Sequence, residues 1–595
     1  MFFSSLLLLL LVSLSALKKR RIESTEVETV TKIVELILKM EDDPNHYADP
    51  SKVFDIPFPF IGIIPDRFSL KYGTFSYMGR ENFIKLWVDI SSLQVGVDFL
   101  STEAKPIFKD ATLYGTLGYG KSHMLATLVS LLIRRGRKVV YIPDCKKFLE
   151  NPFQYLRFSL LMAFLQDKET LVMVLNSETL KDLELICISV ERNSLVFIVD
   201  QFNAIEVNNE YPAKNDLEKL ACQHCLSSAA FQHCILRASS ANNTTATRDS
   251  HKQRSELDIK WFGGLSDNEW NEWSRRFSTF LSFINDEEVR RMRFGTGQVL
   301  LFLKSFMSPE NQGNFEKAWT GFISQQEVRD MSEHLIVFSQ KVLAMSQKMI
   351  ESPLHISMLK GCLMGYVNVQ FKEFYDHRYM FVSDTLEAGC ICGVASEIVA
   401  KILMEADSGL FLKDDWVQRC EVVTNPIVKG FMAEKTILSA IRMQGFHLPD
   451  NNIQVSSHIV FPTGREAECL KKDENVLYIP EAFNYKAIDS IVRFFPASNT
   501  KMLAIAFQVF NSVRHKDSPT MFFPSCEIWE KKSSGRDVEW HFCWISPKKG
   551  ASVMREERVR TLRGQTLKLN PAYHEHYFSF GDIYLPLSFL DSISY

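Results

Sequence analysis

The eight residues GTLGYGKS, at positions 115–122, constrain the fold of this chain more than any other feature of its sequence. They fit the pattern G-x-x-x-x-G-K-[S/T] at every fixed position. The apolar run ATLY precedes them, and HMLATLVSLLIRR follows them at helical spacing. A strand, a glycine-rich turn and a helix in this order predict a phosphate-binding loop (P-loop) in a parallel α/β sheet.

The chemistry of such a loop assigns a role to each kind of residue in it. The glycines let the backbone turn so tightly that successive N–H groups point at phosphate oxygens. Lys121 is expected to bridge the β- and γ-phosphates, and the Ser122 hydroxyl to bind Mg²⁺. ATP and Mg²⁺ are therefore the predicted cofactors, and the predicted nucleotide-binding residues are Gly115, Thr116, Leu117, Gly118, Tyr119, Gly120, Lys121 and Ser122.

A second feature of such enzymes is an acid on a neighbouring strand that holds Mg²⁺ through water. Asp200 ends the apolar run LVFIVD and is predicted to fill that role. The next residue is Gln201, where many ATPases have a second acid. Because glutamine orients water but accepts a proton poorly, slow hydrolysis and a base from elsewhere, such as Glu206, are both open. The chain has no N-K-x-D sequence, which disfavours a Ras-type GTPase.

Patterning along the 595 residues predicts several units, consistent with about 150 residues per domain. Residues 50–75, rich in Pro, Phe and Gly, are predicted to be a loop or linker. Residues 239–254 are polar and are predicted to be a mobile loop. The predicted division is a signal peptide at 1–17, a polar or helical segment with a linker at 18–76, a P-loop NTPase domain at 77–265, a helical region at 266–425 and an α+β domain at 426–595.

Residues 2–21 are the part of the sequence that indicates where the protein is delivered. The apolar run at 2–17 is short and serine-rich for a membrane span, and it has the length of a signal-peptide core. No basic residues precede it, and Lys18, Lys19, Arg20 and Arg21 follow it. A secretion signal, an anchor and a segment without either function stay open, and we expect no stable membrane span. The net charge of −3 demands neither nucleic acid nor a membrane as partner.

The twelve cysteines are scattered, which indicates reduced thiols in the compartment where the protein works. Cys222 and Cys225 have the C-x-x-C spacing of zinc ligands, with His233 and Cys234 further along. Because His233 and Cys234 are adjacent, they cannot easily bind one ion in tetrahedral geometry. A helix with buried thiols is the favoured interpretation.

Several stretches, taken together and in order, resemble the Crinkler effectors and the related retrotransposon-hot-spot-like proteins. The resemblance covers most of residues 77–515. The stretches that carry it include YMGRENFIKLW (77–87), the P-loop region, VVYIPDCKKFLENPFQYL (139–156), VFIVDQFNAIE (196–206), FGTGQVLLFL (294–303), CGVASEIVAKIL (392–403), GFMAEKTILSAI (430–441), AIDSIVRFF (487–495) and AFQVF (506–510).

The resemblance implies a P-loop NTPase domain followed by a restriction-endonuclease-like domain. It assigns Glu434 as the acid on the first helix of that domain, Asp489 as the metal-binding acid, and Gln508 to the acid-or-Gln position. The position two residues later, usually Lys or Thr, is Phe510, which can neither position water nor stabilise a phosphorane. Substitutes could come from Arg514, His515 or Lys516.

Three functions follow as hypotheses. The first is a secreted, ATP-driven nuclease-like effector that acts on nucleic acid, with DNA as one candidate partner and the host cell, including its nucleus, as the candidate destination. The second is a nucleotide-controlled binding switch whose nuclease domain is degenerate and inactive. The third is an intracellular ATPase that is never secreted. The basic residues at 514–516 and 548–563 give mild support for a nucleic-acid partner, although such clusters are more often solvated faces. The sequence specifies neither the host target nor the oligomeric state.

Overall fold

The computed structural model describes residues 25–592, except 95–109, 207–214, 239–255, 312, 349–351, 365–377, 383–387, 407–408, 424–425, 463, 481–487, 498–500, 510–517, 534, 548–549 and 563–564. The chain divides into two compact units. We name them the P-loop unit (Met1–Asn285, Gly297–Ile323 and Phe371–Ser383) and the C-terminal unit (Asp286–Thr296, Ser324–Gln370 and Asp384–Tyr595).

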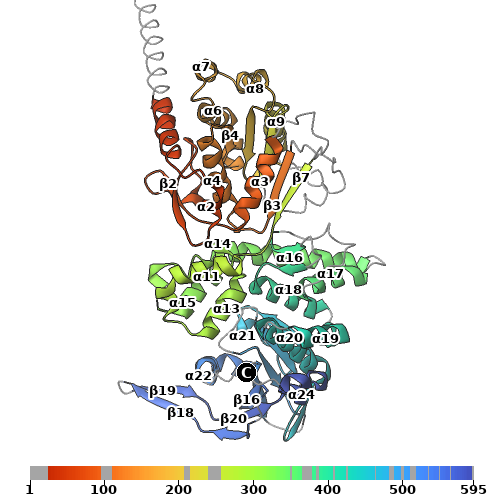
Figure 1. The fold of residues 1–595 in the computed structure, drawn as a ribbon. Helices are drawn as coiled ribbons and strands as arrows, with labels where there is room; N and C mark the ends of the chain where they lie inside the picture. The colour runs from red at the N-terminus through yellow and green to blue at the C-terminus, as the bar shows by residue number, and fades with distance from the viewer. Residues whose placement is uncertain are drawn as a thin grey trace, which may run out of the picture. The chain divides into compact units, whose positions relative to one another are not determined.

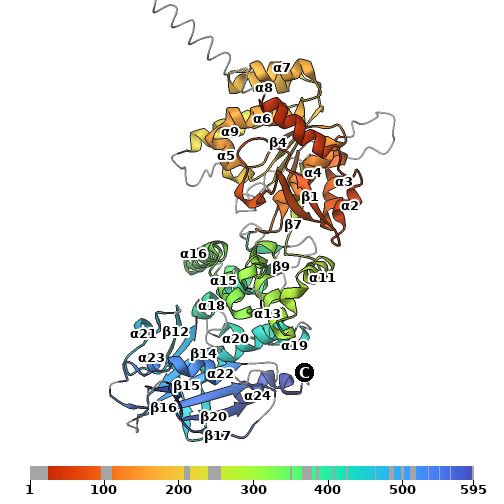
Figure 2. The ribbon, with the colours of Figure 1, turned by 90° about the vertical axis from the view of Figure 1, so that its left-hand side faces the viewer.

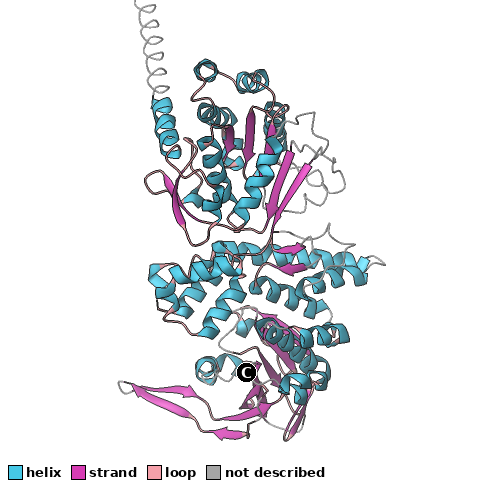
Figure 3. Ribbon diagram, viewed as in Figure 1, coloured by secondary structure: helices cyan, strands magenta, loops and turns pink. Residues whose placement is uncertain are grey.

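The P-loop unit is built on a five-stranded parallel sheet (Figures 1 and 3), so the predicted parallel α/β sheet is confirmed. The strand order is β4-β5-β6-β3-β7. The strands are β3 (Asp110–Gly115), β4 (Lys138–Ile142), β5 (Leu195–Val199), β6 (Cys234–Ala238) and β7 (Glu256–Trp261). All five residues of β5 are buried, as expected of a central strand covered on both faces.

One hydrophobic core runs from residue 30 to residue 261 and includes the segment that precedes the sheet. Residues 50–75 are largely loop, as one part of the prediction had it, but they pack into this core and are not a linker between domains. They include the antiparallel hairpin of β1 (Val53–Pro57) and β2 (Thr74–Met78). Phe58, Phe60 and Phe68 are buried in the core. The Pro and Gly residues that suggested a loop mark turns between buried aromatic side chains.

Helices cover this sheet. Residues 25–37 are also helical. The remaining elements of the P-loop unit are α2 (Pro44–Ala48), η1 (Asp66–Phe68), α3 (Asn82–Gln94), α4 (Lys121–Arg134), α5 (Cys145–Glu150), α6 (Pro152–Ala163), α7 (Lys168–Asn176), α8 (Leu180–Ser189), η2 (Phe202–Ala204), α9 (Asp216–Ala229), α11 (Asp267–Arg276), α12 (Ser278–Leu281), α14 (Leu300–Leu303), η3 (Pro309–Asn311), α15 (Phe315–Ile323) and β8 (Met380–Val382).

The C-terminal unit contains a seven-stranded mixed sheet in the order β12-β13-β14-β15-β16-β20-β17. Strands β13, β14 and β15 form an antiparallel meander, and β16 and β20 continue parallel to β15. The strands are β12 (Ser457–Phe461), β13 (Val476–Pro480), β14 (Ser490–Phe494), β15 (Lys501–Val509), β16 (Asp537–Ile545), β17 (Val553–Arg555) and β20 (Tyr573–Phe578).

Strand β16 is buried on both faces of this sheet from Trp540 to Ile545. Trp540, Phe542 and Trp544 enter a core that also contains Phe522 and Trp529. The indole N–H of Trp544 donates to Glu575 at 2.8 Å, so the polar group of this buried side chain has a partner. Near the end of the chain, residues 585–592 form a 3₁₀ helix, η8 (Leu585–Ser592), in which Pro586 cannot donate to a strand ladder.

Helices α18 (Gly393–Ala406) and α20 (Pro426–Gln444) lie side by side in the C-terminal unit (Figures 1 and 2). The other elements of this unit are α13 (Asp286–Thr296), α16 (Gln326–Lys348), α17 (Ser352–Met364), β9 (Ala388–Cys390), η5 (Leu410–Leu412), α19 (Asp414–Val422), β10 (Phe446–Leu448), β11 (Asn451–Ile453), α21 (Glu466–Cys469), α22 (Ser518–Phe522), η7 (Phe523–Ser525), α23 (Glu527–Glu530), β18 (Arg558–Leu562), β19 (Gln565–Asn570) and α24 (Phe580–Ile583).

Some predictions concern segments outside the described residues. These are the segment 1–17, the loop at 239–254, Phe510 and the basic residues at 514–516. Within the part of the chain that the structure describes, no helix is both long enough and apolar enough to cross a membrane.

Candidate nucleotide site and a buried carboxylate cluster

The backbone of the P-loop has the conformation that its glycines were expected to allow. Gly115, Gly118 and Gly120 have φ angles of 147°, 76° and 103°, which side-chain-bearing residues rarely adopt. A Cβ on Gly115 would lie 1.7 Å from the carbonyl oxygen of Trp261, and one on Gly118 would lie 2.5 Å from the Cβ of Leu301. Both positions therefore require glycine for space as well as for conformation.

Lys121 is the first residue of α4, and its ammonium group lies against the loop that precedes it. Its Nζ donates to the carbonyl oxygens of Gly115 at 2.9 Å and Thr116 at 2.8 Å. Burial lowers the pKa of Lys121 to about 8, against the opposing effect of Asp200. A lysine at this end of α4, next to the positive end of the helix dipole, favours an anion there.

A buried ion pair supports the loop. Arg80 Nε lies 2.8 Å from Glu269 Oε1, and both side chains are 2% exposed. The Arg80 guanidinium also donates to the carbonyl oxygen of Tyr119 and lies 4.4 Å from the centre of the Tyr119 ring. Because the loop residue Tyr119 packs on this pair, removing one partner would leave an uncompensated buried charge beside the loop. Neither residue was predicted from the sequence, because Arg80 and Glu269 lie 189 positions apart.

Asp200 follows β5 directly, as predicted, and is 3% exposed. Its Oδ1 accepts a hydrogen bond from the backbone N–H of Gln201 at 2.8 Å. Gln201 has a left-handed backbone with φ of 56°, a conformation that few non-glycine residues adopt. The chain therefore turns sharply at the residue where many ATPases place a second acid.

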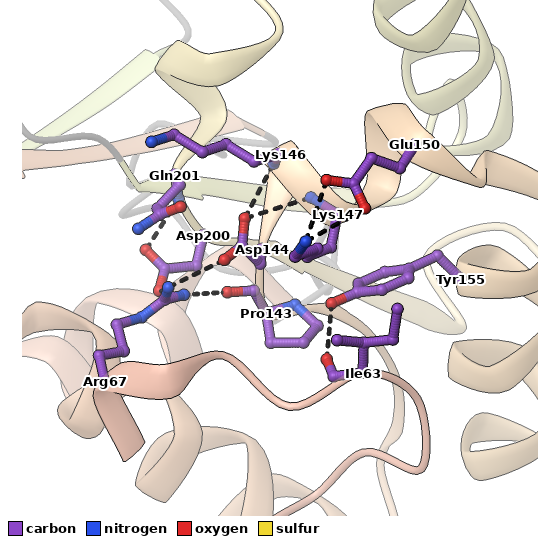
Figure 4. Close-up of polar contacts among 10 residues, drawn as sticks. All are labelled: Ile63, Arg67, Pro143, Asp144, Lys146, Lys147, Glu150, Tyr155, Asp200 and Gln201. Atoms are coloured by element: carbon purple, nitrogen blue, oxygen red, sulfur yellow. Dashed lines mark hydrogen bonds and ion pairs between the residues drawn. The ribbon is translucent and has the colours of Figure 1, made fainter. Parts of the chain in front are cut away.

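Arg67 was not predicted to belong to this site. Its guanidinium lies 3.1 Å from Asp200 Oδ2 and 3.1 Å from Asp144 Oδ2, and it also donates to the carbonyl oxygen of Pro143 (Figure 4). Asp144 follows β4 as the N-cap of α5, where its Oδ1 accepts from the N–H of Lys146 at 2.8 Å. A cation thus already lies on the carboxylate that was predicted to hold Mg²⁺.

The C-terminal unit brings Glu434, Asp489 and Gln508 into one neighbourhood. Asp489 precedes β14 and Gln508 lies on β15, and Asp489 Oδ2 accepts from Gln508 Nε2 at 3.2 Å and from the N–H of Val509 at 2.6 Å. Burial, together with the nearby charge of Glu434, raises the pKa of Asp489 well above its ordinary value. Oε1 of Gln508 is buried and has no hydrogen-bond partner among the described residues.

Two further residues in this cluster were not predicted. Lys435 Nζ lies 2.7 Å from Glu397 Oε2 on α18 and 2.6 Å from Glu434 Oε1 on its own helix. Burial lowers the pKa of Lys435, but the two carboxylates outweigh that effect, so its pKa lies above the ordinary value. Burial also raises the pKa of Glu434. Glu397 lies outside the predicted domain of residues 426–595, so the cluster extends beyond that boundary.

Metal ligation was considered at several places. Among the described residues, no group of three or more His, Cys, Asp or Glu side chains is arranged to hold a metal ion. Cys222 and Cys225 lie buried on α9, and His233 contacts the carbonyl oxygen of Cys187 through Nε2 at 2.8 Å. This arrangement fits the interpretation of the C-x-x-C pair as buried thiols of a helix.

Comparisons with known proteins were made on both sequence and structure. No family model matches the chain, and no curated protein matches it. Among solved structures, a DNA replication initiation factor is similar at 12% identity and a TM-score of 0.22, over 60% of this chain and 94% of that protein. DnaA from Aquifex aeolicus bound to AMPPCP is similar at 13% identity and a TM-score of 0.21, over 56% of this chain and 81% of that protein. Similarity at this level carries no functional argument.

Proposed function

We propose that this protein binds ATP through the P-loop at 115–122 and hydrolyses it slowly with Mg²⁺. The observation that carries the proposal is the loop itself, in which three left-handed glycines lead from a parallel strand into a helix that begins with Lys121. Ser122 and Asp200 offer the hydroxyl and carboxylate oxygens that Mg²⁺ prefers. Slow hydrolysis follows from Gln201, which cannot serve as a strong base.

Replacement of Lys121 tests this function. Lys121→Ala removes the side-chain charge that meets the β- and γ-phosphates, so we expect ATP affinity to fall by at least about tenfold with the fold unchanged. Lys138→Ala is a matched control, because Lys138 is a partly exposed lysine of the same sheet that pairs with Asp167 at 2.8 Å. Calorimetric titration of both variants measures the difference. Unaltered ATP binding by Lys121→Ala would refute the P-loop function.

The proposal for the C-terminal unit is a restriction-endonuclease-like domain that cleaves DNA. Its support is the resemblance to Crinkler effectors, a helix followed by an antiparallel meander and a parallel strand, and the grouping of Asp489 with Gln508. Glu434, Asp489 and the unpartnered Gln508 Oε1 are the oxygen donors that would hold Mg²⁺. When bound, Mg²⁺ would supply charge stabilisation for phosphodiester cleavage.

The same cluster also gives a reason to keep the alternative. Lys435 already forms ion pairs with Glu434 and Glu397, and residue 510 is a phenylalanine where a lysine or threonine is usual. A nucleotide-controlled binding switch with an inactive nuclease domain is therefore the second candidate. Measurement of Mg²⁺-dependent DNA cleavage by residues 18–595, with and without ATP, separates the two functions.

Delivery is a further part of the proposal. By resemblance to the Crinkler effectors, the protein would be secreted and would act in a host cell, with the nucleus as its destination, whereas an intracellular ATPase is the alternative. Sequencing the N-terminus of the mature protein from its natural source tests this. A mature chain that begins near residue 18 supports secretion, and one that begins at Met1 favours the intracellular alternative.

A further inference from the structure

Arg67 bridges two carboxylates at the edge of the P-loop sheet. Nη1 lies 3.1 Å from Asp144 Oδ2, and Nη2 lies 3.1 Å from Asp200 Oδ2. The side chains of Asp144 and Asp200 are 10% and 5% exposed, whereas the side chain of Arg67 is 24% exposed. The arginine therefore lies against two nearly buried acids (Figure 4), and its own side chain is still partly open to solvent.

The bridge that Arg67 forms between Asp144 and Asp200 lies at the same edge of the sheet as the P-loop. Asp144 follows β4, Asp200 follows β5, and the P-loop follows β3, and the carboxyl ends of parallel strands lie at the same edge of a sheet. Asp200 acts electrostatically on both Arg67 and Lys121. Arg67 in turn contributes to lowering the pKa of His123, the residue after Ser122, to about 4, although burial is the larger cause.

The contacts of the guanidinium differ in how open they are to competition. Nη2 donates both to the backbone carbonyl oxygen of Pro143 and to Asp200, and Nη1 donates to Asp144. Asp144 is fixed as a helix N-cap, because its other carboxylate oxygen accepts from the backbone of Lys146 and Lys147. Asp200 is the acid expected to hold Mg²⁺ through water. An ion at Asp200 would repel the Nη2 side of Arg67, since two cations would then share one carboxylate. The Nη1 contact with Asp144 does not face that competition.

We propose that Arg67 is a γ-phosphate-binding residue that distinguishes ATP from ADP, an inference that rests on the proposed ATP-binding function. When Mg²⁺·ATP binds, one N–H of Nη2 leaves Asp200 and donates to an oxygen of the terminal phosphate, while the other N–H of Nη2 stays on the carbonyl oxygen of Pro143 and Nη1 stays on Asp144. A guanidinium suits this exchange, because its donors form a rigid fork in which one side can stay fixed as the other changes partner. ADP offers no terminal phosphate, so Arg67 would keep its contact with Asp200.

Affinities of the full chain for Mg²⁺·ATP and Mg²⁺·ADP test the proposal. For Arg67→Ala we expect the ATP affinity to fall by about tenfold or more, the scale of losing a charged hydrogen bond, and the ADP affinity to stay within about twofold. Arg67→Lys keeps the charge without the fork and should fall between Arg67→Ala and the wild type. It also serves if Arg67→Ala does not fold. Arg157→Ala is the matched control, because Arg157 pairs with Glu26 at 2.8 Å with a similar degree of burial.

The possible results distinguish the γ-phosphate role of Arg67 from the proposed ATP-binding function on which that role rests. A loss of affinity confined to ATP supports the γ-phosphate role. An equal loss for ATP and ADP, as a merely structural arginine would give, overturns it. A gain in ATP affinity overturns it as well, since Arg67 would then only compete with Mg²⁺ for Asp200. If the wild-type protein binds neither nucleotide, the proposed ATP-binding function itself has failed.

Discussion

The P-loop unit and the C-terminal unit both hold acidic groups beside a cation, but they neutralise those groups differently. Asp200 is paired with Arg67, whose side chain is 24% exposed and lies where an incoming ion or phosphate can compete for it. Glu434 and Glu397 are paired with Lys435, whose side chain is 2% exposed. An ion or phosphate could therefore displace Arg67 from Asp200 at low cost. In the C-terminal unit, by contrast, the buried ion pair between Lys435 and Glu434 must break before Glu434 can bind a metal.

Asp489→Ala is expected to have the largest effect, because it would abolish any DNA cleavage. Without Asp489, the proposed site keeps Glu434, which is tied to Lys435, and the neutral oxygen of Gln508. ATP affinity should be unchanged, since the P-loop belongs to the other unit. Cleavage of plasmid DNA by wild type and variant, with ATP titrations of both, measures this. Normal cleavage by the variant would remove Asp489 from the mechanism.

Lys435→Met tests how much a buried lysine contributes to the free energy of unfolding compared with an exposed one. It leaves Glu397 and Glu434 without their shared partner, and breaking a buried pair in this way costs about 3–5 kcal/mol of unfolding free energy. Lys501→Met is the control, because Lys501 is 48% exposed and pairs with Glu539 at 3.2 Å. Exposed pairs contribute about 1 kcal/mol or less. Equal changes in urea denaturation of the two variants would contradict the assignment of Lys435 as a buried charge on which the fold depends.

Substitutions of Asp200 and Gln201 test whether the nucleotide site of the P-loop unit hydrolyses ATP or only binds it. Asp200→Ala should lower ATP hydrolysis by about a hundredfold, because the ion loses its protein carboxylate. Gln201→Glu should raise the rate by about tenfold by supplying a base beside the ion. Phosphate release under saturating ATP measures both. If Asp200→Ala hydrolyses ATP normally, the Mg²⁺ acid lies elsewhere.

The smallest expected effect is a pH dependence of ATP binding. The pKa of Lys121 is lowered from 10.5 to about 8, so the folded protein loses the charge of Lys121 as pH rises through about 8. The bound phosphates favour the charged form, so affinity should fall by about fourfold between pH 7 and pH 8.5. The lowered pKa also makes the free energy of unfolding depend on pH. The contribution of Lys121 to stability is fully present above pH 10.5 and is lost as pH falls toward 8, because the folded protein then has to hold a buried charge. Calorimetry at both pH values should show proton uptake on binding, and its absence would argue against the shift.

The features found from sequence alone were those encoded by neighbouring residues. The P-loop, β5 and the position of Asp200 follow from contiguous patterns of glycine, lysine and apolar residues. Arg67, Arg80 and Glu397 gave no such signal, because their partners lie 133, 189 and 38 positions away and only tertiary packing brings them together. The burial of residues 50–75 in the core was missed for a related reason, since Pro and Gly indicate turns but not whether the side chains between them are buried.

The helix at residues 25–37 also limits where a peptidase can cut the N-terminal part of the chain without loss of stability. Val30, Val34 and Ile37 are buried in the core of the P-loop unit, and each such side chain contributes roughly 1.5–3 kcal/mol by leaving water. Together they amount to much of the roughly 5–15 kcal/mol that keeps an ordinary domain folded. A peptidase that cuts near residue 17 leaves this helix intact. One that cuts beyond Ile37 would release a chain whose sheet has lost part of its cover, so the permissible cleavage sites end where this helix begins to pack.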